Sequence, residues 1–230
     1  MARMAATRTV RAPATDAAHT GTSTLNALTS VATAIAILGV ALLPLLTPLV
    51  LHPLLDASTS AAWLQLSPSL VHDLSDRTVN ELVFGPGSFA FAGPDGAAFY
   101  QASEIAHLRD ARTLLILFEG LTVVCLVFAA WSAARRRAWS QIRRGAAGLA
   151  IGIVVVGVVD FFAFEPAFEL FHEIFFPGGN WAFDPRTSHM VQLYPYDFWQ
   201  LTAGTLGVIG LVGAAIVWAV ARRRAGAPRA

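Results

Sequence analysis

Four long apolar stretches divide the chain, and each is long enough to cross the hydrocarbon core of a membrane, which takes about 20 residues. They cover about residues 31–51, 113–134, 146–164 and 198–221. The first and the last carry no charged residue, the second carries only Glu119, and the third carries only Asp160. The pattern therefore predicts four membrane-spanning helices.

Two long polar segments, 52–112 and 165–197, predict a cap of short helices and loops at one end of the helices. Within the first segment, Ser69 to Phe84 places its leucines and valines near one stripe, which predicts an amphipathic helix ending at Gly85. From about Phe99 the helical pattern resumes and is expected to run unbroken into the second span.

The ends of the chain are expected to be tails. Residues 1–28 are rich in Ala, Thr and Ser, a composition typical of disorder. Residues 222–230 form a short basic segment. The membrane domain is then expected over 29–221. Its first span is expected to be a retained anchor, because its apolar run exceeds the ~7–15 residues of a signal peptide core. Pro44 and Pro48 predict a kink in that span.

The arginines predict the orientation in the membrane. Of the 16 basic residues, all of them Arg, twelve lie before the first span, between the second and third spans, or after the fourth, beside a single acid, Asp16. The other side holds four arginines and twelve acids. Because positively charged segments stay inside, both termini are expected to be cytoplasmic and the cap to face outward.

Composition narrows the class of protein further. The chain is 55% hydrophobic and 13% charged, with a formal net charge of +1 and a single Cys. Soluble domains average about 25% charged residues. These values exclude a disulfide-stapled secreted domain, a disordered chain and a nucleic-acid binder, and they indicate an integral membrane protein.

A first candidate site lies where the second span begins. Glu104, His107 and Asp110 are spaced i, i+3, i+6, so they share one helical face. Carboxylates one turn away can orient a His and raise its basicity. The alternative is a polar helix end at the membrane interface, with Arg109 and Arg112 paired to nearby acids.

A second candidate site lies in the later outer segment, which is rich in aromatic residues. Thirteen of the 24 Phe, Trp and Tyr residues lie between Phe161 and Trp199. Nine of them are Phe, which favours a walled pocket of low dielectric over an interfacial belt of Trp and Tyr. Glu169, His172 and Glu173 share a face there, so His172 also has carboxylates within reach; the alternative is an interfacial His with satisfied hydrogen bonds.

Other polar residues are open to two interpretations. Carboxyls inside a span are costly and often mark a pathway or a buried partner, so Glu119 and Asp160 are candidates. Alternatively, Glu119 is protonated or bonded to a polar group such as Thr122 or Asp160. His52 and His72 are expected to be solvated and to play no part in chemistry.

Two of these motifs, taken together, resemble those of the bacterial lipoprotein intramolecular transacylase (Lit) family. The first is E-x-x-H-[LM]-x-D-x-[KR], from Glu104 to Arg112. The second is F-H-E-I-F-F at Phe171 to Phe176, followed by Trp181, Phe183-Asp184-Pro185 and Tyr194-Pro195-x-x-Phe198-Trp199. The resemblance covers about Val31 to Val220. It implies an all-α integral membrane fold, with four transmembrane helices and an extracytoplasmic cap, and two catalytic histidines, which match His107 and His172.

The resemblance also implies a reaction. The sn-2 acyl chain of a diacylglyceryl lipoprotein moves to the α-amine of its N-terminal Cys, giving a lyso-form N-acylated lipoprotein, on the outer face of a bacterial plasma membrane. Histidine suits such proton transfers near neutral pH. Which His is the base and which the acid stays open. The side chains expected to bind substrate or orient the histidines are Glu104, Asp110, Arg112, Glu169, Glu173, Phe171, Phe175, Trp181 and Trp199.

No metal ion and no cofactor is expected; the expected partners are the diacylated lipoprotein and membrane lipid. One alternative is a metal-dependent membrane hydrolase, in which both histidines and Glu104, Glu169 or Glu173 would hold Zn²⁺. The other is a non-enzymatic scaffold that docks a partner through the aromatic loop.

Overall fold

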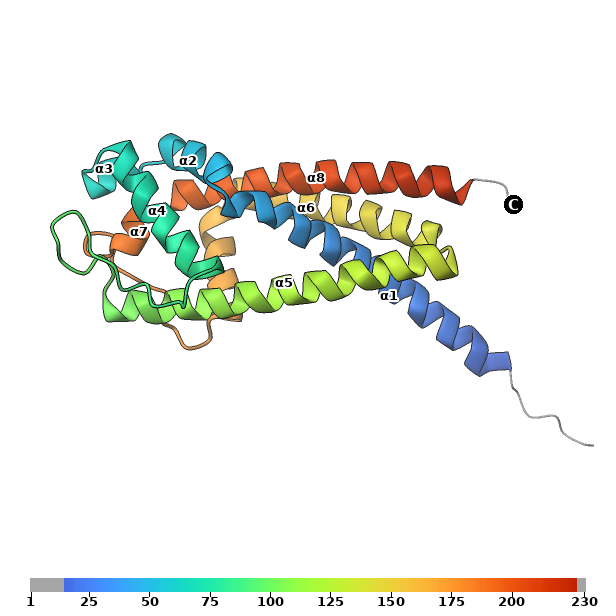
Figure 1. Ribbon diagram of the computed structural model, residues 1–230. Helices are drawn as coiled ribbons and strands as arrows, with labels where there is room; N and C mark the ends of the chain where they lie inside the picture. The colour runs from blue at the N-terminus through green and yellow to red at the C-terminus, as the bar shows by residue number, and fades with distance from the viewer. Residues whose placement is uncertain (1–14, 227–230) are drawn as a thin grey trace, which may run out of the picture.

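The computed structural model describes residues 15–226, in which long helices run side by side and carry a helical cap at one end (Figure 1). The long helices are α1 (Thr15–Leu42), α5 (Ala102–Arg136), α6 (Trp139–Phe175) and α8 (Tyr196–Ala225). All four, the first extended to Leu46, are long and apolar enough to cross a membrane. The prediction of four spanning helices is confirmed.

Short helices form the cap and pack around one apolar core. They are α2 (Pro48–Ala57), α3 (Ser60–Leu64), α4 (Pro68–Val83) and α7 (His189–Leu193), and the 3-10 turn η1 (Leu43–Leu46) leads from α1 into them. Leu55, Phe89, Leu193 and Phe198 are almost completely buried in this core, which joins the cap to the adjoining ends of α5 and α8. The amphipathic helix predicted over Ser69 to Phe84 is α4, and the predicted continuous helix into the second span is α5.

The first span ends earlier than predicted. α1 stops at Leu42, a 3-10 turn follows, and α2 begins at Pro48. A proline inside a helix removes one backbone hydrogen bond and clashes with the carbonyl four residues earlier. Pro44 and Pro48 therefore end the helix where a kink was predicted, and residues 48–51 belong to the cap.

The expected disordered tail does not hold for residues 15–28, which are helical in α1. Tertiary contacts account for part of this difference. Arg136, in the last turn of α5, donates to the carbonyl of Leu25 and to Oδ1 of Asn26, at 3.3 and 2.9 Å. Residues 1–14 of the expected tail lie outside the described residues. At the other terminus, α8 continues to Ala225, so residues 222–225 of the second expected tail are helical, and residues 227–230 lie outside the described residues.

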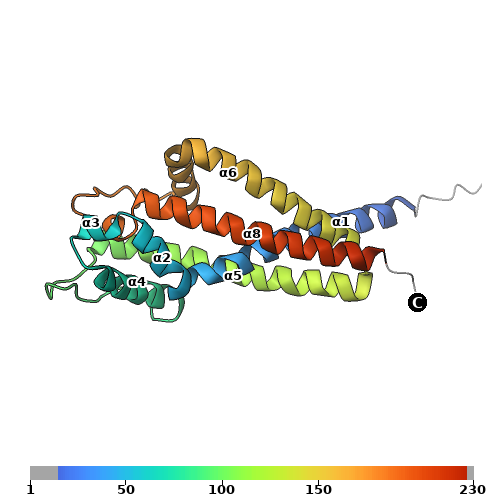
Figure 2. The same ribbon diagram turned by 90° about the horizontal axis from the view of Figure 1, so that it is seen from above.

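α6 runs beyond the predicted third span and bends. Ala163 has non-helical dihedrals (φ −147°, ψ 46°), and Pro166 follows in the next turn. Because a proline ring clashes with the carbonyl of residue i−4, the bend falls just before it. The final turns of α6 then run across the bundle toward α5 (Figures 1 and 2). The polar segment predicted over 165–197 thus begins as a helix, up to Phe175.

Small and polar residues let the spans approach closely. A Cβ added at Gly39 of α1 would overlap the side chain of Thr122 on α5. Thr29 on α1 donates a buried hydrogen bond to Ser132 on α5, at 3.2 Å. Such contacts are typical of helices that pack in lipid. α1 begins, α5 meets α6 and α8 ends at the end opposite the cap (Figure 1), so the arginine-rich segments among the described residues share that end.

Candidate active site

His107 and His172 come together beneath the cap. His107 lies in the first turns of α5, above the apolar run 113–134, and His172 lies on the bent end of α6, beyond the run 146–164. Their ring centroids are 5.9 Å apart with an interplanar angle of 26°. Only 7% of His107 and 9% of His172 is exposed. Residues far apart in the sequence thus form one buried histidine pair near the cap, beyond the apolar runs 113–134 and 146–164 of the two helices.

Aromatic rings enclose this pair. Phe176 packs against both imidazoles, at 4.6 Å from His107 and 5.4 Å from His172 between ring centroids. Phe168 lies 4.1 Å and Trp181 5.2 Å from His172. Phe183 lies 5.9 Å from His107. The surroundings are therefore of low dielectric, which disfavours the charged imidazolium form.

Both histidines have lowered pKa values. Burial is the main cause of the lowered pKa of His107, from 6.5 to about 4, and the neighbouring His172 adds to it, while Asn180 and Asp110 oppose the shift. Burial also lowers the pKa of His172, although the Phe168 carbonyl opposes the shift. At neutral pH both rings are therefore neutral, and each has one nitrogen able to accept a proton.

A hydrogen bond fixes the tautomer of His172. Its Nδ1 lies 2.8 Å from the carbonyl oxygen of Phe168, one turn earlier on α6. A carbonyl only accepts, so Nδ1 carries the proton and Nε2 carries the lone pair. Nδ1 of His107, by contrast, is buried with no hydrogen-bond partner among the described residues.

Glu104 does not orient His107, as its spacing had suggested. Its carboxyl is fully buried and accepts three hydrogen bonds: from the backbone N–H of Gln101 (2.6 Å), from the Ser188 hydroxyl (2.6 Å) and from the backbone N–H of Met190 (2.9 Å). The first bond closes a capping box at the start of α5. The other two fasten this end of α5 to the start of α7, so Glu104 holds the scaffold beneath the histidine.

The other predicted carboxylates are not hydrogen-bonded to the imidazole nitrogens either. Asp110 accepts a hydrogen bond of 2.7 Å from the side chain of Asn180. Glu169 and Glu173 are exposed, and His172 is held by a backbone carbonyl in their place. No carboxylate among the described residues is hydrogen-bonded to either imidazole, although the charge of Asp110 raises the pKa of His107, as the spacing predicts. Asn180 was missed, because it comes from a loop about 70 residues further along the chain.

Arg112 and Arg109 fasten α4 to α5. Arg112 donates to the backbone carbonyls of Glu81 and Gly85, at 3.0 and 2.8 Å, and Arg109 donates to that of Gly87, at 3.0 Å. The accepting carbonyls belong to the last turn of α4 and to the loop that follows it in the chain. Such carbonyls have no partner within their own helix, and the guanidinium groups supply one. Arg112 thus serves to position the cap.

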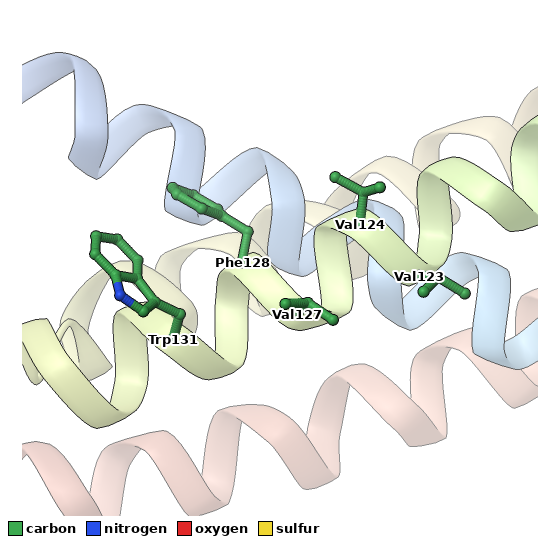
Figure 3. A pocket seen from close by; sticks show the side chains of 5 residues that line it. All are labelled: Val123, Val124, Val127, Phe128 and Trp131. Carbon is green, nitrogen blue, oxygen red and sulfur yellow. The ribbon is translucent and has the colours of Figure 1, made fainter.

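A groove of about 400 Å³ opens beside the histidine pair, between α5 and the end of α6. It is lined by Asp110, Thr113, Leu114, Leu117, Phe175, Phe176, Pro177, Gly178 and Asn180. Its lining is polar near Asp110 and Asn180 and apolar further down α5. A second hollow, of about 420 Å³, lies deeper along α5 (Figure 3) and is lined by three valines, Phe128 and Trp131. It has no titratable side chain among its lining residues.

The predicted aromatic residues take different places. Trp181 contacts His172 directly, and Phe171 lies 5.4 Å from His172 between ring centroids. Phe175 packs against Phe171 and lines the groove. Trp199 lies one ring further out, 6.4 Å from Phe168. The sequence therefore identified the aromatic wall but left out Phe168, Phe176 and Phe183, which touch the histidines themselves.

The two carboxyls inside the spans lie apart from the pair. Glu119 is nine residues after Asp110, which places it on the opposite face of α5, toward the bundle interior. Its Oε1 and the Thr122 hydroxyl are both buried, with no hydrogen-bond partner among the described residues. Asp160 is half-buried near the bend of α6. The described residues show no hydrogen bond between Glu119 and Thr122 or Asp160.

Metal ligands do not converge in the part of the chain that the structure describes: no three His, Cys, Asp or Glu side chains there are grouped to hold a metal ion. The set of two histidines and a glutamate that a metal-dependent hydrolase would need is not assembled, because Glu104 is bonded elsewhere and Glu169 and Glu173 are exposed.

The fold and the site define an integral membrane protein with four spans, a cap, and a buried, aromatic-enclosed histidine pair between them. The chain belongs to the lipoprotein intramolecular transacylase Lit family, whose model matches residues 68–199, more than half of its length.

Solved structures share the fold. The membrane-integral lipoprotein intramolecular transacylase Lit from Bacillus cereus superposes with a TM-score of 0.75 at 14% identity, over 90% of this chain and 97% of that one. Two variants of the same protein, each with one histidine replaced, by Arg or by Ala, give TM-scores of 0.72 and 0.73 at 16% identity. They cover 91% of this chain and 95% and 97% of theirs.

An uncharacterized protein from Aquifex aeolicus (strain VF5) is 27% identical over 119 residues. That match spans 50% of this chain and 51% of the relative, so it relates about half of each protein.

Proposed function

We propose that this protein is a lipoprotein intramolecular transacylase of a bacterial plasma membrane. It moves the sn-2 acyl chain of a diacylglyceryl lipoprotein to the α-amine of the N-terminal Cys, leaving a lyso-form N-acylated lipoprotein. The observation that carries the proposal is the neutral histidine pair at the groove between α5 and α6, in a chain of the Lit family. The family name supplies the lipoprotein substrate.

The reaction needs one proton to move from nitrogen to oxygen. The amine attacks the ester carbonyl, an N–C bond forms, the ester C–O bond breaks, and the amine proton ends on the glycerol oxygen. His172 suits the transfer, because its Nδ1–H is held by the Phe168 carbonyl and its Nε2 is free to accept. The same imidazolium then returns the proton to the departing oxygen.

His107 serves beside His172 as the second neutral imidazole. A neutral ring near a transiently protonated one avoids repulsion between two cations, and it can donate a hydrogen bond to the oxyanion that develops on the ester carbonyl. The lowered pKa of His107, caused by burial and by His172, keeps the ring in that neutral form.

The groove supports a lipid substrate. Its apolar part, with Leu114, Leu117 and Phe175, suits acyl chains, and its polar part near Asp110 and Asn180 suits the glyceryl ester and the Cys backbone. The rings of Phe176 and Trp181 exclude water from the histidines. Exclusion of water matters here, since a water molecule in place of the amine would hydrolyse the ester.

The arginine distribution supports the orientation proposed for this reaction. The arginine-rich end of the helices would face the cytoplasm, and the cap with the histidine pair would face the outer side, where diacylated lipoproteins are displayed. Both termini would then be cytoplasmic.

Tandem mass spectrometry of the N-terminal peptide of a diacylated lipoprotein tests the proposal. The lipoprotein is co-expressed with the full chain or with its His107→Ala/His172→Ala double variant. Because the transfer is an isomerisation, the intact mass stays constant. The fragments that locate the acyl chain show whether the transfer has taken place. An N-acylated Cys with the native chain, and a free amine with the double variant, supports the proposal. Free fatty acid with an unmodified amine would identify a hydrolase, and no change would overturn the activity.

A further inference from the structure

The groove beside the histidine pair and the deeper hollow both lie along α5. The groove takes several lining residues from this helix, the last of them Leu117. The deeper hollow, of about 420 Å³, takes all its lining residues from α5, and they follow one another along the helix from Val123 to Trp131 (Figure 3). Only residues 118–122 separate the two along the chain.

One stripe of α5 connects the groove to the hollow. Positions three and four apart share a helical face. The members of the stripe have this spacing, are exposed and carry no charge; they are Thr113, Leu117, Gly120, Val124, Val127 and Trp131. α1 packs on a different face of α5, where Thr122 meets Gly39 and Cys125 meets Ala32 and Ala36. The stripe is therefore left uncovered by α1.

Gly120 leaves the middle of the stripe open. A Cβ added there would meet no heavy atom within 4 Å. Glycine inside a helix is destabilising relative to alanine, and close helix packing, which accounts for Gly39 against Thr122, does not require it here. No side chain at position 120 interrupts the path from the groove to the hollow.

Distances along α5 match the length of a lipid acyl chain. A hydrocarbon core is about 30 Å thick, so the acyl chain of one leaflet spans about 15 Å. At about 1.5 Å per residue, that length measured from Thr113 ends at Val123. A chain whose ester lies in the polar part of the groove therefore passes Gly120 and ends in the hollow. Phe128 and Trp131 stack there, with ring centroids 5.7 Å apart, and form its far end.

The near end of this path reaches the histidine pair through Phe176. Its ring lines the groove and packs against both imidazoles, at 4.6 Å from His107 and 5.4 Å from His172 between ring centroids. The far end lies within a helix that is long and apolar enough to span a membrane, and its lining side chains are all uncharged. Continuity with the groove, apolar lining and length all favour an acyl chain as the occupant.

We propose that the stripe of α5 from Leu117 to Trp131 binds the acyl chain that is transferred and selects it by length. A long chain lies over Gly120 with its end in the hollow, and the stacked rings of Phe128 and Trp131 limit the length that fits. The inference rests on the proposed function, because the chain it places is the sn-2 chain of the lipoprotein.

Transfer rates with chains of different length test the selection. The substrates are diacylglyceryl lipopeptides with sn-2 chains of about 8 or about 16 carbons; the shorter chain covers about half a leaflet and ends before Gly120. Gly120→Leu puts a side chain across the stripe without a clash at its Cβ. Since one methylene in an apolar pocket is worth about 10- to 200-fold, we expect kcat/KM to fall at least ~10-fold for the long chain and to stay within about twofold for the short one.

Gly152→Leu on α6 is the matched control. A Cβ at Gly152 also meets no heavy atom within 4 Å, and Gly152 lines neither the groove nor the hollow. The control is expected to leave both rates unchanged. Equal losses for both chain lengths in Gly120→Leu, no loss for either, or the same long-chain loss in Gly152→Leu would overturn the inference.

Photocrosslinking locates the chain without turnover. The long substrate carries a diazirine at the last carbon of its sn-2 chain or near the ester, and it is mixed with the His107→Ala/His172→Ala double variant in phospholipid vesicles. Peptide mass spectrometry is expected to find the terminal label within residues 123–131 and the other label within 113–117, with both removed by excess unlabelled lipopeptide.

The other occupants of the stripe would give different labelling. Label spread over all the spanning helices and not displaced would indicate bulk membrane lipid, and no label within 123–131 would indicate a face covered by a second copy of the chain. Either result would overturn the inference. Displaceable label within 123–131, with no acyl transfer by the native chain, would overturn the proposed function and leave the acyl-chain site standing.

Discussion

Two pairs of histidines lie close together among the described residues, and their environments are opposite. His52 on α2 and His72 on α4 stack with their ring centroids 4.0 Å apart and nearly parallel. Each is bonded through Nε2 to an aspartate, His52 to Asp76 at 2.9 Å and His72 to Asp56 at 2.8 Å. His107 and His172 are further apart and more buried, and neither has a carboxylate bonded to its ring among the described residues.

The difference separates a pair that joins two helices of the cap from the pair that we propose to be catalytic. Carboxylate partners occupy ring nitrogens of His52 and His72 and join α2 to α4 within the cap. Aromatic walls around His107 and His172 leave a nitrogen of each ring free and keep both rings neutral. The spacing of His and acids in the sequence pointed to the two histidines that the structure brings together, but no carboxylate is hydrogen-bonded to either ring among the described residues.

The largest expected effect is on activity. His172→Ala removes the proposed base and His107→Ala removes the proposed donor, so each is expected to slow acyl transfer about 10²- to 10⁴-fold. His52→Ala and His72→Ala are the matched controls, with rates within about twofold of the native protein. The rates are measured from the appearance of the N-acyl fragment. A loss of the same size in the His52 and His72 variants would remove the distinction between the pairs.

The next effect is on stability and concerns the carboxylates. Glu104→Ala leaves the Ser188 hydroxyl and two backbone N–H groups without their acceptor, at about 1–3 kcal/mol for each buried group left unsatisfied. Glu169→Ala changes an exposed side chain and is expected to stay within about 0.5 kcal/mol. Unfolding in detergent, followed by circular dichroism, measures both. Equal stabilities would mean that Glu104 does not fasten α5 to α7.

The pH dependence of stability follows from the lowered pKa of both buried histidines. The unfolded chain takes up protons at these histidines at a higher pH than the folded chain does. Their contribution to stability is therefore complete above pH 6.5 and is lost as pH falls, for His107 toward about 4. Melting temperatures between pH 7.5 and 4.5 are expected to fall less steeply in His107→Gln/His172→Gln than in the native protein. A steeper fall in the variant would contradict the sign.

The smallest effect concerns the stacked pair. The bonds of His52 and His72 to aspartates are partly exposed, with 27% and 21% of the histidine side chains accessible. Exposed ion pairs contribute about 0–1 kcal/mol, so His72→Ala is expected to cost no more than about 1 kcal/mol in the same unfolding measurement. A loss of several kcal/mol would show that the stack is essential to the cap.

The fold was largely predictable, because hydropathy is a local property. Runs of about 20 apolar residues identified the four spans, and a leucine and valine stripe identified α4. The errors in the bounds of α1 arose where proline geometry or contacts with a distant residue decide whether the chain is helical. Prolines at 44 and 48 end α1 earlier than a hydropathy window indicates, and Arg136 holds residues that composition alone assigned to a disordered tail.

The site was predictable only in part. The two motifs identified His107 and His172, but local spacing gave the wrong partners to both. Glu104 is bonded to residues after position 187, and Asp110 is bonded to Asn180, partners that no pattern near α5 could reveal. Helical spacing predicts which residues share a face of one helix. The hydrogen bonds of Glu104 and Asp110 described above join α5 to residues after α6, so spacing along α5 does not predict them.

The bend at Ala163 has a consequence for how this chain tolerates changes of length. Beyond the bend, the helix must deliver His172 at one angular setting against α5. One residue added or deleted between Ala163 and His172 would turn the imidazole by about 100° around the helix axis. The exposed loop near Gly96, where an added Cβ meets nothing within 4 Å, carries no such constraint. Variation in length is therefore expected to collect in that loop and to be absent from the nine-residue interval that ends at His172.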